Sequence, residues 1–218
     1  MYAANKEINI IGEDHIATSL ETPLRANAFD LSDDKKIEAI QNHFAEIMHI
    51  LGLDLSDDSL SGTPHRVAKM YVKEIFSGLN PANKPEAKLF HNKYEYNEML
   101  IEKDITLYSY CEHHFVPIIG KVHVAYISTG QVIGLSKINR LVQYYSKRPQ
   151  VQERLTNQIA EGLKEALQSE NVGVIIEATH LCVASRGIKD TNTSTITAYY
   201  SGKFRDEKTK AEFISLTK

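Results

Sequence analysis

Cysteine and histidine lie close together in one short segment, Cys111-Glu112-His113-His114. A thiolate and an imidazole three positions apart are ligands that suit zinc. Residues three apart face opposite sides of an extended strand, so Cys111 and His114 can bind one ion only if the chain bends between them. We therefore expect this segment at the end of a strand.

A second pair, His180 and Cys182, follows a run rich in Val and Ile. On a strand these two positions face the same side, so one strand can bring both side chains to the first segment. Counting Cys111, His114 and Cys182 as ligands leaves a fourth position open for water, whose pKa zinc lowers to about 7. His113 and His180 then remain beside the metal as proton carriers, because an unperturbed imidazole has a pKa of about 6.5.

Two other interpretations fit the same spacing. One is a closed structural zinc site with a histidine as the fourth ligand, and the other is a pair of buried thiols with ordinary surface histidines. The chain has only two cysteines. They would form a disulfide in an exported protein, whereas a reducing cytoplasm favours metal binding or catalysis.

Basic side chains gather on a predicted helix that begins at Ser136. Lys137 and Arg140 are three apart and share one face of this helix, and Arg186 follows Cys182 by four residues. Unpaired backbone amides at a helix N-terminus add to such cations, so the group predicts a phosphate site. A solvated helix face is the alternative, and for any single Lys or Arg it is the better interpretation.

Gln152 and Glu153 follow Pro149 in the first turn of another predicted helix. A carboxylate at this place is ordinary helix-dipole chemistry, and from the residues alone this interpretation is favoured. A fixed carboxylate can also accept paired hydrogen bonds from an amidine-like edge, such as N1–H and the 2-amino group of guanine.

The elements that must position these residues fall into two groups. Apolar residues at helical spacing predict amphipathic helices over 32–51 and 63–76, and beyond them the period changes to two. The further predicted elements are strands near 101–107, 122–126, 132, 174–183 and 193–201, and helices at 136–145 and 151–167. Strands grouped apart from helices predict an α+β domain with a mostly antiparallel sheet.

Three regions follow from this order. We expect an N-terminal arm at 1–31, a helical region at 32–85 and an α+β catalytic domain at 86–218. Residues 1–60 carry a net charge of −8 and the rest +5, so an anionic ligand belongs to the later part. This modest and scattered excess is unlike the basic stripe of a nucleic-acid-binding protein, so we expect no nucleic acid as partner.

Composition places the chain among ordinary globular proteins. Hydrophobic residues make up 42% and charged residues 24%, which suggests neither disorder nor a membrane protein. The first thirty residues lack the basic-then-apolar order of a signal peptide, so a cytoplasmic location is the default expectation.

At the residues described above, the sequence resembles the GTP cyclohydrolase I family, from about residue 33 to residue 215. The matching segments are Gly-Thr-Pro-His-Arg-Val-Ala-Lys-Met at 62–70, Cys-Glu-His-His-Phe-Val at 111–116, Ile-Gly-Leu-Ser-Lys-Ile-Asn-Arg at 133–140, Arg-Pro-Gln-Val-Gln-Glu-Arg-Leu-Thr at 148–156, and His-Leu-Cys with Arg-Gly-Ile at 180–188. Several long motifs in the same order make a chance match implausible.

The resemblance implies a tunnelling fold, an antiparallel sheet with helices on one face, preceded here by the helical region. Small subunits of this fold join their sheets into a ring, two rings stack into a homodecamer, and active sites lie between subunits. The resemblance implies zinc (Zn²⁺) bound by Cys111, His114 and Cys182, an acid–base pair of His113 and His180, a guanine anchor of Glu153 with Gln152 nearby, and a triphosphate clamp of Ser136, Lys137, Arg140 and Arg186, joined by Arg66 and Lys69 from a neighbouring subunit.

The implied reaction is hydrolysis of GTP at C8, with release of formate and rearrangement to 7,8-dihydroneopterin triphosphate, the first step of tetrahydrofolate and pterin biosynthesis. Other tunnelling-fold enzymes acting on pterin or deazaguanine compounds are the nearest rivals, and the paired Cys-Glu-His-His and His-Leu-Cys motifs favour the hydrolase over them. A guanine-nucleotide-binding module with structural zinc is the rival from another class. A formate assay separates that module from the enzyme.

Overall fold

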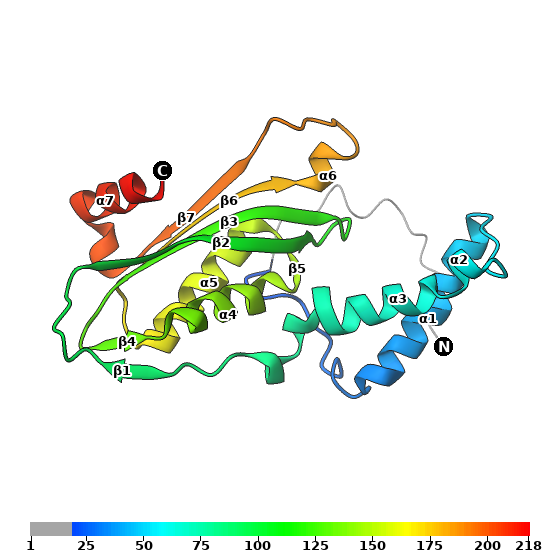
Figure 1. The fold of residues 1–218 in the computed structure, drawn as a ribbon, viewed down its shortest axis with the longest axis horizontal. Coiled ribbons are helices and arrows are strands. Elements are labelled where there is room, and N and C mark those ends of the chain that lie inside the picture. Colours follow the sequence, from blue (N-terminus) through cyan, green and yellow to red (C-terminus); the bar gives the residue numbers. More distant parts are fainter. Residues whose placement is uncertain (1–18) are drawn as a thin grey trace.

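A computed structural model describes residues 19–218 (Figure 1). The expected arm therefore lies partly outside the described residues, which include only its last part, from Ser19 onward. No helix in the described part of the chain is long and apolar enough to cross a membrane.

The first helices form a separate region at one end of the molecule (Figure 1). They are α1 (Asp33–Ile50), α2 (Asp58–Ser61), α3 (Thr63–Met70), a π-helical turn at Tyr71–Ile75, and short 3-10 turns at Ser77–Leu79 and Pro81–Asn83. The Ser32 side chain caps α1 by accepting a hydrogen bond from the Lys35 N–H at 3.4 Å. Pro64 lies in the first turn of α3, where its missing N–H would have had no helical partner.

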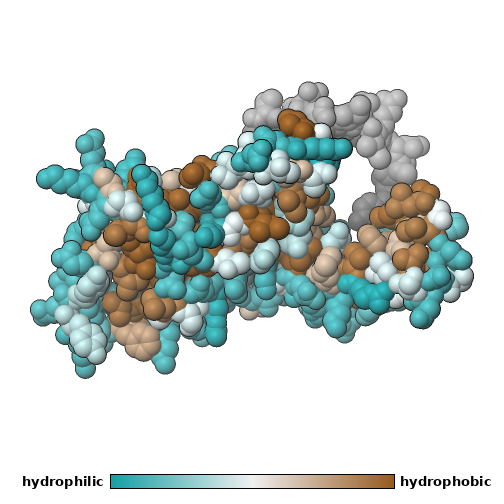
Figure 2. Space-filling view, turned by 45° about the horizontal axis from the view of Figure 1, so that its top comes forward, coloured by the Kyte–Doolittle hydropathy of each residue, from teal (hydrophilic) through white to brown (hydrophobic). Residues whose placement is uncertain are grey.

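Apolar side chains remain exposed where α1 ends. Ile50 is 74% and Leu51 71% exposed, and Ile47 and Leu53 are also exposed. Figure 2 shows hydrophobic surface gathered at this end of the molecule, over the N-terminal helices. Contiguous apolar patches of this kind are common on surfaces through which proteins contact one another.

A five-stranded sheet forms the body of the molecule, in the order β5-β2-β3-β6-β7. Its strands are β2 (Met99–Cys111), β3 (Pro117–Ile127), β5 (Pro149–Gln150), β6 (Val172–His180) and β7 (Thr195–Tyr200). All neighbours are antiparallel except β5, which pairs in parallel with the last two residues of β2. A separate two-stranded sheet joins β1 (Leu89–His91) to β4 (Gln131–Ile133).

Helices α4 (Leu135–Ser146) and α5 (Gln152–Leu167) cover one face of this sheet (Figure 1). Alternation along the strands places every second side chain on that face. The main core contains Leu107, Val122, Val124, Ile138, Leu155, Ile159, Leu163 and Ile176. On the opposite face, Phe204 and Phe213 pack against Ala125, Ile127 and Ile175, and Phe213 belongs to the C-terminal helix α7 (Glu207–Thr217).

One β-bulge interrupts the pairing of β2 with β3. Glu102 pairs with Val124 and Ile105 with Val122, so two residues of β2 stand opposite the single residue His123. Asp104 takes a left-handed conformation with φ of 59°, which Asp tolerates better than most residues. Its N–H donates to Nδ1 of the buried His123 at 3.2 Å.

The helical region is held against the end of α4 by a close backbone approach at Gly78. The Gly78 N–H donates to the Lys147 carbonyl at 2.9 Å, and the Arg148 side chain donates to the Gly78 carbonyl at 2.9 Å. A Cβ atom at this position would come within 2.0 Å of the Tyr144 carbonyl oxygen. Only glycine fits this contact without moving the backbone.

The predicted α+β class and its antiparallel sheet are confirmed, and so are the predicted helices on one face. Two details were wrong. Strand β6 ends at His180, and Cys182 lies in the helical turn α6 (Leu181–Ala184). Helix α4 begins at Leu135, so Ser136 lies in its first turn instead of capping it.

Candidate metal centre and active site

Three side chains converge where β2 and β6 end. One ligand atom each from Cys111, His114 and Cys182 lie within 4.8 Å of one another. The chain turns directly after Cys111: the Phe115 N–H donates to the Cys111 carbonyl at 2.8 Å, and Phe115 has a φ of 53°. This tight turn supplies the bend that brings positions 111 and 114 to one side.

The donor set of this group fits zinc. Two sulfur atoms and one imidazole are ligands that zinc accepts in tetrahedral sites, whereas Ca²⁺ and Mg²⁺ prefer oxygen. Cys111 is buried, Cys182 is half-buried and His114 is exposed, so the group opens toward solvent on the His114 side. Burial, together with the neighbouring Cys111, raises the pKa of the Cys182 thiol, and a divalent cation would reverse this effect.

His113 lies beside the metal group. Its Nδ1 is 3.6 Å from the Cys111 Sγ, and its Nε2 is 3.9 Å from a carboxylate oxygen of Glu112. Glu112 is held by the buried Arg154, whose guanidinium donates to both of its carboxylate oxygens, at 2.6 and 3.3 Å. The Arg154 Nε donates in addition to the Ser19 carbonyl at 2.8 Å. The metal-binding turn is therefore fixed from behind by a two-pronged ion pair.

His180 ends β6 and is half-buried. Its Nε2 lies 2.8 Å from Oε1 of Gln152, the first residue of α5. Burial lowers the pKa of His180, and the Glu153 carboxylate opposes this shift. Glu153 itself is exposed and forms no hydrogen bond or ion pair with residues 19–218, so its carboxylate is available to a ligand.

Arg186 also belongs to this site. Its guanidinium, which can only donate, lies 3.0 Å from Nε2 of His114 and occupies the lone pair of this nitrogen. The cation also lies close enough to Cys182 to favour its thiolate. Of the basic residues identified in the sequence, Arg186 is the one that the structure brings to the metal group of its own chain.

The other basic residues lie elsewhere in the same chain. The first turns of α4 carry Ser136, Lys137 and Arg140, and the Asn139 amide of this segment donates to Glu102 at 3.3 Å. Glu102 precedes Cys111 by nine residues on β2. A strand of this length spans roughly 30 Å, so the start of α4 lies toward the end of β2 that is remote from the metal group.

Arg66 and Lys69 lie on α3, in the N-terminal region. Both are exposed, and the Arg66 guanidinium donates within this region to the Ser59 carbonyl at 3.4 Å and the Thr63 hydroxyl at 3.3 Å. The structure thus brings together seven of the predicted residues (Cys111, His113, His114, Gln152, Glu153, His180 and Cys182) with Arg186, and leaves five apart (Arg66, Lys69, Ser136, Lys137 and Arg140).

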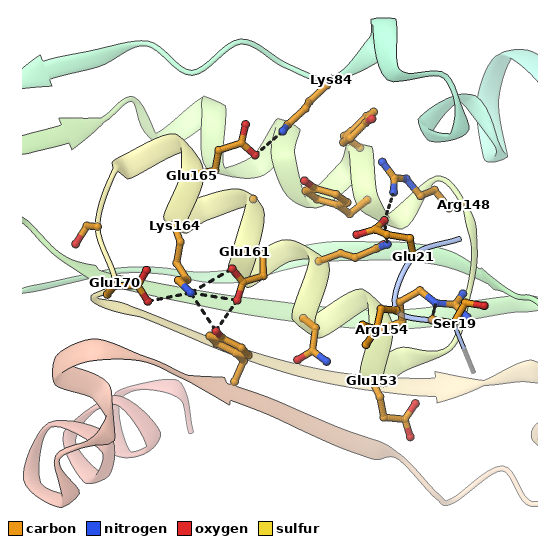
Figure 3. Close-up of a pocket in the computed structure, with 18 of the residues that line it drawn as sticks. Ser19, Glu21, Lys84, Arg148, Glu153, Arg154, Glu161, Lys164, Glu165 and Glu170 are labelled. Carbon is orange, nitrogen blue, oxygen red and sulfur yellow. Dashed lines mark hydrogen bonds and ion pairs between the residues drawn. The ribbon is translucent and has the colours of Figure 1, made fainter. Parts of the chain in front are cut away.

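A cavity of about 1060 Å³ lies along α5 and the end of α4, and Cys111, His114 and Cys182 are not among its lining residues. Figure 3 shows that its cations point toward carboxylates: Lys84 pairs with Glu165 at 2.6 Å, and Lys164 with Glu161 and Glu170. Because these charges are already neutralised, the cavity offers little to a polyanionic ligand.

The fold and the site together define a class: an α+β enzyme with an open Cys-His-Cys metal group and two histidines beside it. The family model of GTP cyclohydrolase I matches residues 40–218. Among curated proteins, the chain is 59% identical to "GTP cyclohydrolase 1" of Flavobacterium johnsoniae over 208 residues, which cover 95% of this chain and 93% of the relative. It is 50% identical to the proteins of the same name from Citrobacter koseri and Escherichia coli over 215 residues, 98% of this chain and 97% of each relative. The chain belongs to the GTP cyclohydrolase I family.

Sequence reasoning missed the residues that support the site from behind. Glu112 lies between two candidate metal-site residues, and no function was predicted for it. Arg154 was noted only as part of the segment 148–156 that resembles the family. The two are 42 residues apart, and nothing in their spacing indicates a pair. A charged residue inside the apolar stripe of α5 was the one available signal, because buried charges are rare unless they are paired.

Proposed function

We propose that this chain hydrolyses GTP at C8 of the guanine ring, releases formate and forms 7,8-dihydroneopterin triphosphate. The observation that supports this most directly is the group of Cys111, His114 and Cys182, with ligand atoms within 4.8 Å, beside two histidines. The names of the relatives, GTP cyclohydrolase 1, supply the substrate.

Cys111, His114 and Cys182 would hold the zinc ion as two thiolates and one neutral imidazole. When bound, zinc would lower the pKa of a coordinated water to about 7 and so supply the nucleophile near neutral pH. The thiolate form of Cys182 would be favoured by the Arg186 cation beside it. Arg186 is also within reach of an anionic part of the substrate near the metal group.

His113 and His180 are assigned the proton transfers. Opening of the imidazole ring needs a proton on the departing nitrogen, and rearrangement of the ribose needs protons moved to and from sugar oxygens and carbons. His113 lies 3.6 Å from the Cys111 sulfur, and His180 is held by α5. Both rings therefore border the position where C8 would be attacked.

Glu153 is assigned the guanine. Its exposed carboxylate has two acceptor oxygens and forms no hydrogen bond or ion pair with the described residues, which suits the N1–H and 2-amino donors of guanine. It also lies near His180, whose pKa it raises against the effect of burial. This neighbourhood would bring the base and the proton carriers together.

The triphosphate is assigned to Ser136, Lys137 and Arg140 of a neighbouring copy, with Arg66 and Lys69 from a neighbouring helical region. Their position toward the end of β2 that is remote from the metal group of the same chain favours sites built between subunits. The free outer edge of β7 and the exposed apolar end of α1 offer contact surfaces for such a homo-oligomer, which we propose is a decamer in the cytoplasm.

A formate assay tests the proposal. Purified, zinc-loaded protein is incubated with GTP, formate is measured, and the ultraviolet spectrum is recorded, with a chelator-treated sample as control. We expect zinc-dependent formate and the absorbance of a pterin. Formate without a pterin spectrum would contradict the rearrangement, and bound GTP without formate would indicate a nucleotide-binding protein whose zinc is structural.

A further inference from the structure

The side-chain amide of Gln152 has only one workable orientation. This side chain is 1% exposed, and its Nε2 lies 3.2 Å from the Ile176 carbonyl oxygen and 2.9 Å from the Thr195 carbonyl oxygen. Carbonyl oxygens accept hydrogen bonds and never donate them. The group that faces them must therefore be the NH₂ end of the amide.

A hydroxyl group on β7 fixes the same orientation independently. Nε2 also lies 3.0 Å from the Thr197 hydroxyl, which is 2.7 Å from the Thr156 hydroxyl. The Thr156 hydroxyl donates to the Gln152 backbone carbonyl at 2.8 Å, and each hydroxyl has one hydrogen. Thr197 must then donate to Thr156, and it offers Gln152 only a lone pair. A reversed amide would set Oε1 against three acceptors.

The orientation of the amide decides which nitrogen of His180 carries hydrogen. With Nε2 of Gln152 facing three acceptors, which its two hydrogens share, its Oε1 faces the His180 Nε2 at 2.8 Å. An amide oxygen can only accept, so this imidazole nitrogen must donate. We propose that Gln152 is a positioning residue that holds His180 in its Nε2–H tautomer and leaves Nδ1 as the nitrogen that exchanges protons with the substrate.

This arrangement suits a residue that must act in several proton transfers. The neutral Nε2–H tautomer and the imidazolium ion both carry hydrogen on Nε2, so the bond to Gln152 persists in either state. The ring keeps its position while Nδ1 gains and loses its proton. An amide partner does this without adding charge, unlike the carboxylate that orients histidine in many hydrolases.

The inference rests on the proposed function for the role of His180, and it changes the role expected for Gln152. A guanine-binding Gln152 would present its amide to the ligand. Instead, its Nε2 is occupied by Ile176, Thr195 and Thr197, and its Oε1 by His180. Glu153 is the neighbouring residue that remains free to bind the base.

The tautomer can be measured on the unaltered protein. Zinc-loaded protein with ¹⁵N-labelled histidine is studied by magic-angle-spinning NMR at a pH of about 8.5, well above the ordinary imidazole pKa of about 6.5. Subtracting the spectrum of His180→Gln isolates the His180 signals. We expect Nε2 as the protonated ring nitrogen and Nδ1 as the unprotonated one. Protonation at Nδ1 would overturn the proposal. This readout needs no turnover, so a failure of the proposed reaction is recognised separately, by the absence of formate.

The substitution Gln152→Met tests the catalytic consequence, because it keeps the volume of the side chain and removes the acceptor. We expect kcat to fall at least tenfold, with KM for GTP within about twofold and zinc content unchanged. The matched control is Gln158→Met, another buried glutamine on α5, whose amide contacts Gln150 and Glu21. It should keep kcat.

The opposite kinetic pattern would contradict the inference. If Gln152 contacts the substrate directly, Gln152→Met raises KM for GTP several-fold and leaves kcat nearly unchanged. Should Gln152→Met not fold, the NMR measurement on the unaltered protein still decides which nitrogen carries hydrogen.

Discussion

The sulfur atoms of Cys111, at the end of β2, and Cys182, in the helical turn α6, are far apart in the sequence and meet only in the folded chain. Both thiols are free of disulfides, and one is buried. Two thiols beside an imidazole, with ligand atoms within 4.8 Å, are better explained by a shared metal ion than by packing alone.

Replacing Cys182 by Ala should remove the metal. We expect zinc, measured by elemental analysis after gel filtration, to fall from about one ion per chain to background, because two ligands of a three-residue site hold zinc poorly. Formate production should fall with it by more than about a hundredfold. Val183→Ala, on the same helical turn, is the control and should keep both. Unchanged zinc in Cys182→Ala would exclude this ligand set.

Glu112 and Arg154, the ion pair behind the metal-binding turn, should contribute to the free energy of unfolding as a coupled pair. Arg154 is 3% exposed at its side chain and Glu112 20%, so removing one partner leaves a charge in a mostly buried place. We expect Arg154→Met to lower the free energy of unfolding by about 3–5 kcal/mol. The double variant Glu112→Gln with Arg154→Met should lose less than the sum of the single variants in urea unfolding. Additive losses would show that the two side chains act independently.

Residue types and spacing identified the candidate metal ligands and both histidines. They did not show that Gln152 and Glu153 have different roles, one contacting His180 and the other exposed to a ligand. Successive residues of an α-helix point about 100° apart, so one of two neighbours can be buried while the other is exposed. In this chain Gln152 is buried and Glu153 is exposed. Sequence alone could not decide which, because the answer depends on β7, which lies more than 40 residues further along the chain.

At the scale of elements, the bulge in β2 places a titratable side chain in the sheet. Burial lowers the pKa of His123, against the attraction of Asp104. Its Nδ1 accepts the hydrogen bond from the Asp104 N–H, which protonation of Nδ1 would break. Neutral His123 is therefore the form that the folded sheet requires.

The stability of this sheet should fall as the pH drops. Below the unfolded-state pKa of about 6.5 the unfolded chain binds a proton at His123 while the folded chain does not, until the lowered folded-state pKa is reached. His123→Asn keeps an acceptor near the Asp104 N–H but cannot titrate. Urea unfolding at pH 7.5 and 5.0 gives the free energy of unfolding of the unaltered protein and of the variant. On going from pH 7.5 to 5.0, the unaltered protein should lose up to about 1.4 kcal/mol more than the variant for each unit by which the pKa of His123 is lowered. An unchanged difference would mean that His123 titrates normally.

Strong periodicity predicted most elements, and weak local signals account for those that were missed. The stripes of α1, α4 and α5 are clear in the sequence, and their helices are present. We predicted no helix at Glu207–Thr217, where Phe213 is the single buried residue. The strand assignment of Cys182 was wrong because alternation does not show where a strand ends.

At the scale of the whole molecule, no strand within residues 19–218 pairs with the outer edge of β7. The Ser201 N–H donates to the Val172 carbonyl on β6, so by alternation the N–H of Ala198 points away from β6. An outward-facing N–H row of this kind is a template for pairing with another chain.

Ala198→Pro should break the assembly while keeping the fold of the subunit, because proline removes an N–H that β6 does not use. We expect sedimentation velocity to show small species in place of a large oligomer, together with a loss of formate production greater than about tenfold. Ala198→Thr is the control and should assemble normally. A fully assembled Ala198→Pro protein would argue against pairing through this edge.

The distance between the metal group and the basic start of α4 has a consequence for mixtures of chains. On the proposed shared site, a chain lacking Cys182 still lends an intact Arg140 to its neighbour, and a chain lacking Arg140 still offers an intact metal group. Two preparations that are each inactive should therefore complement one another once their subunits exchange. With equal amounts and random assembly, about a quarter of the sites would combine an intact metal group from one chain with an intact Arg140 from its neighbour, and would be active.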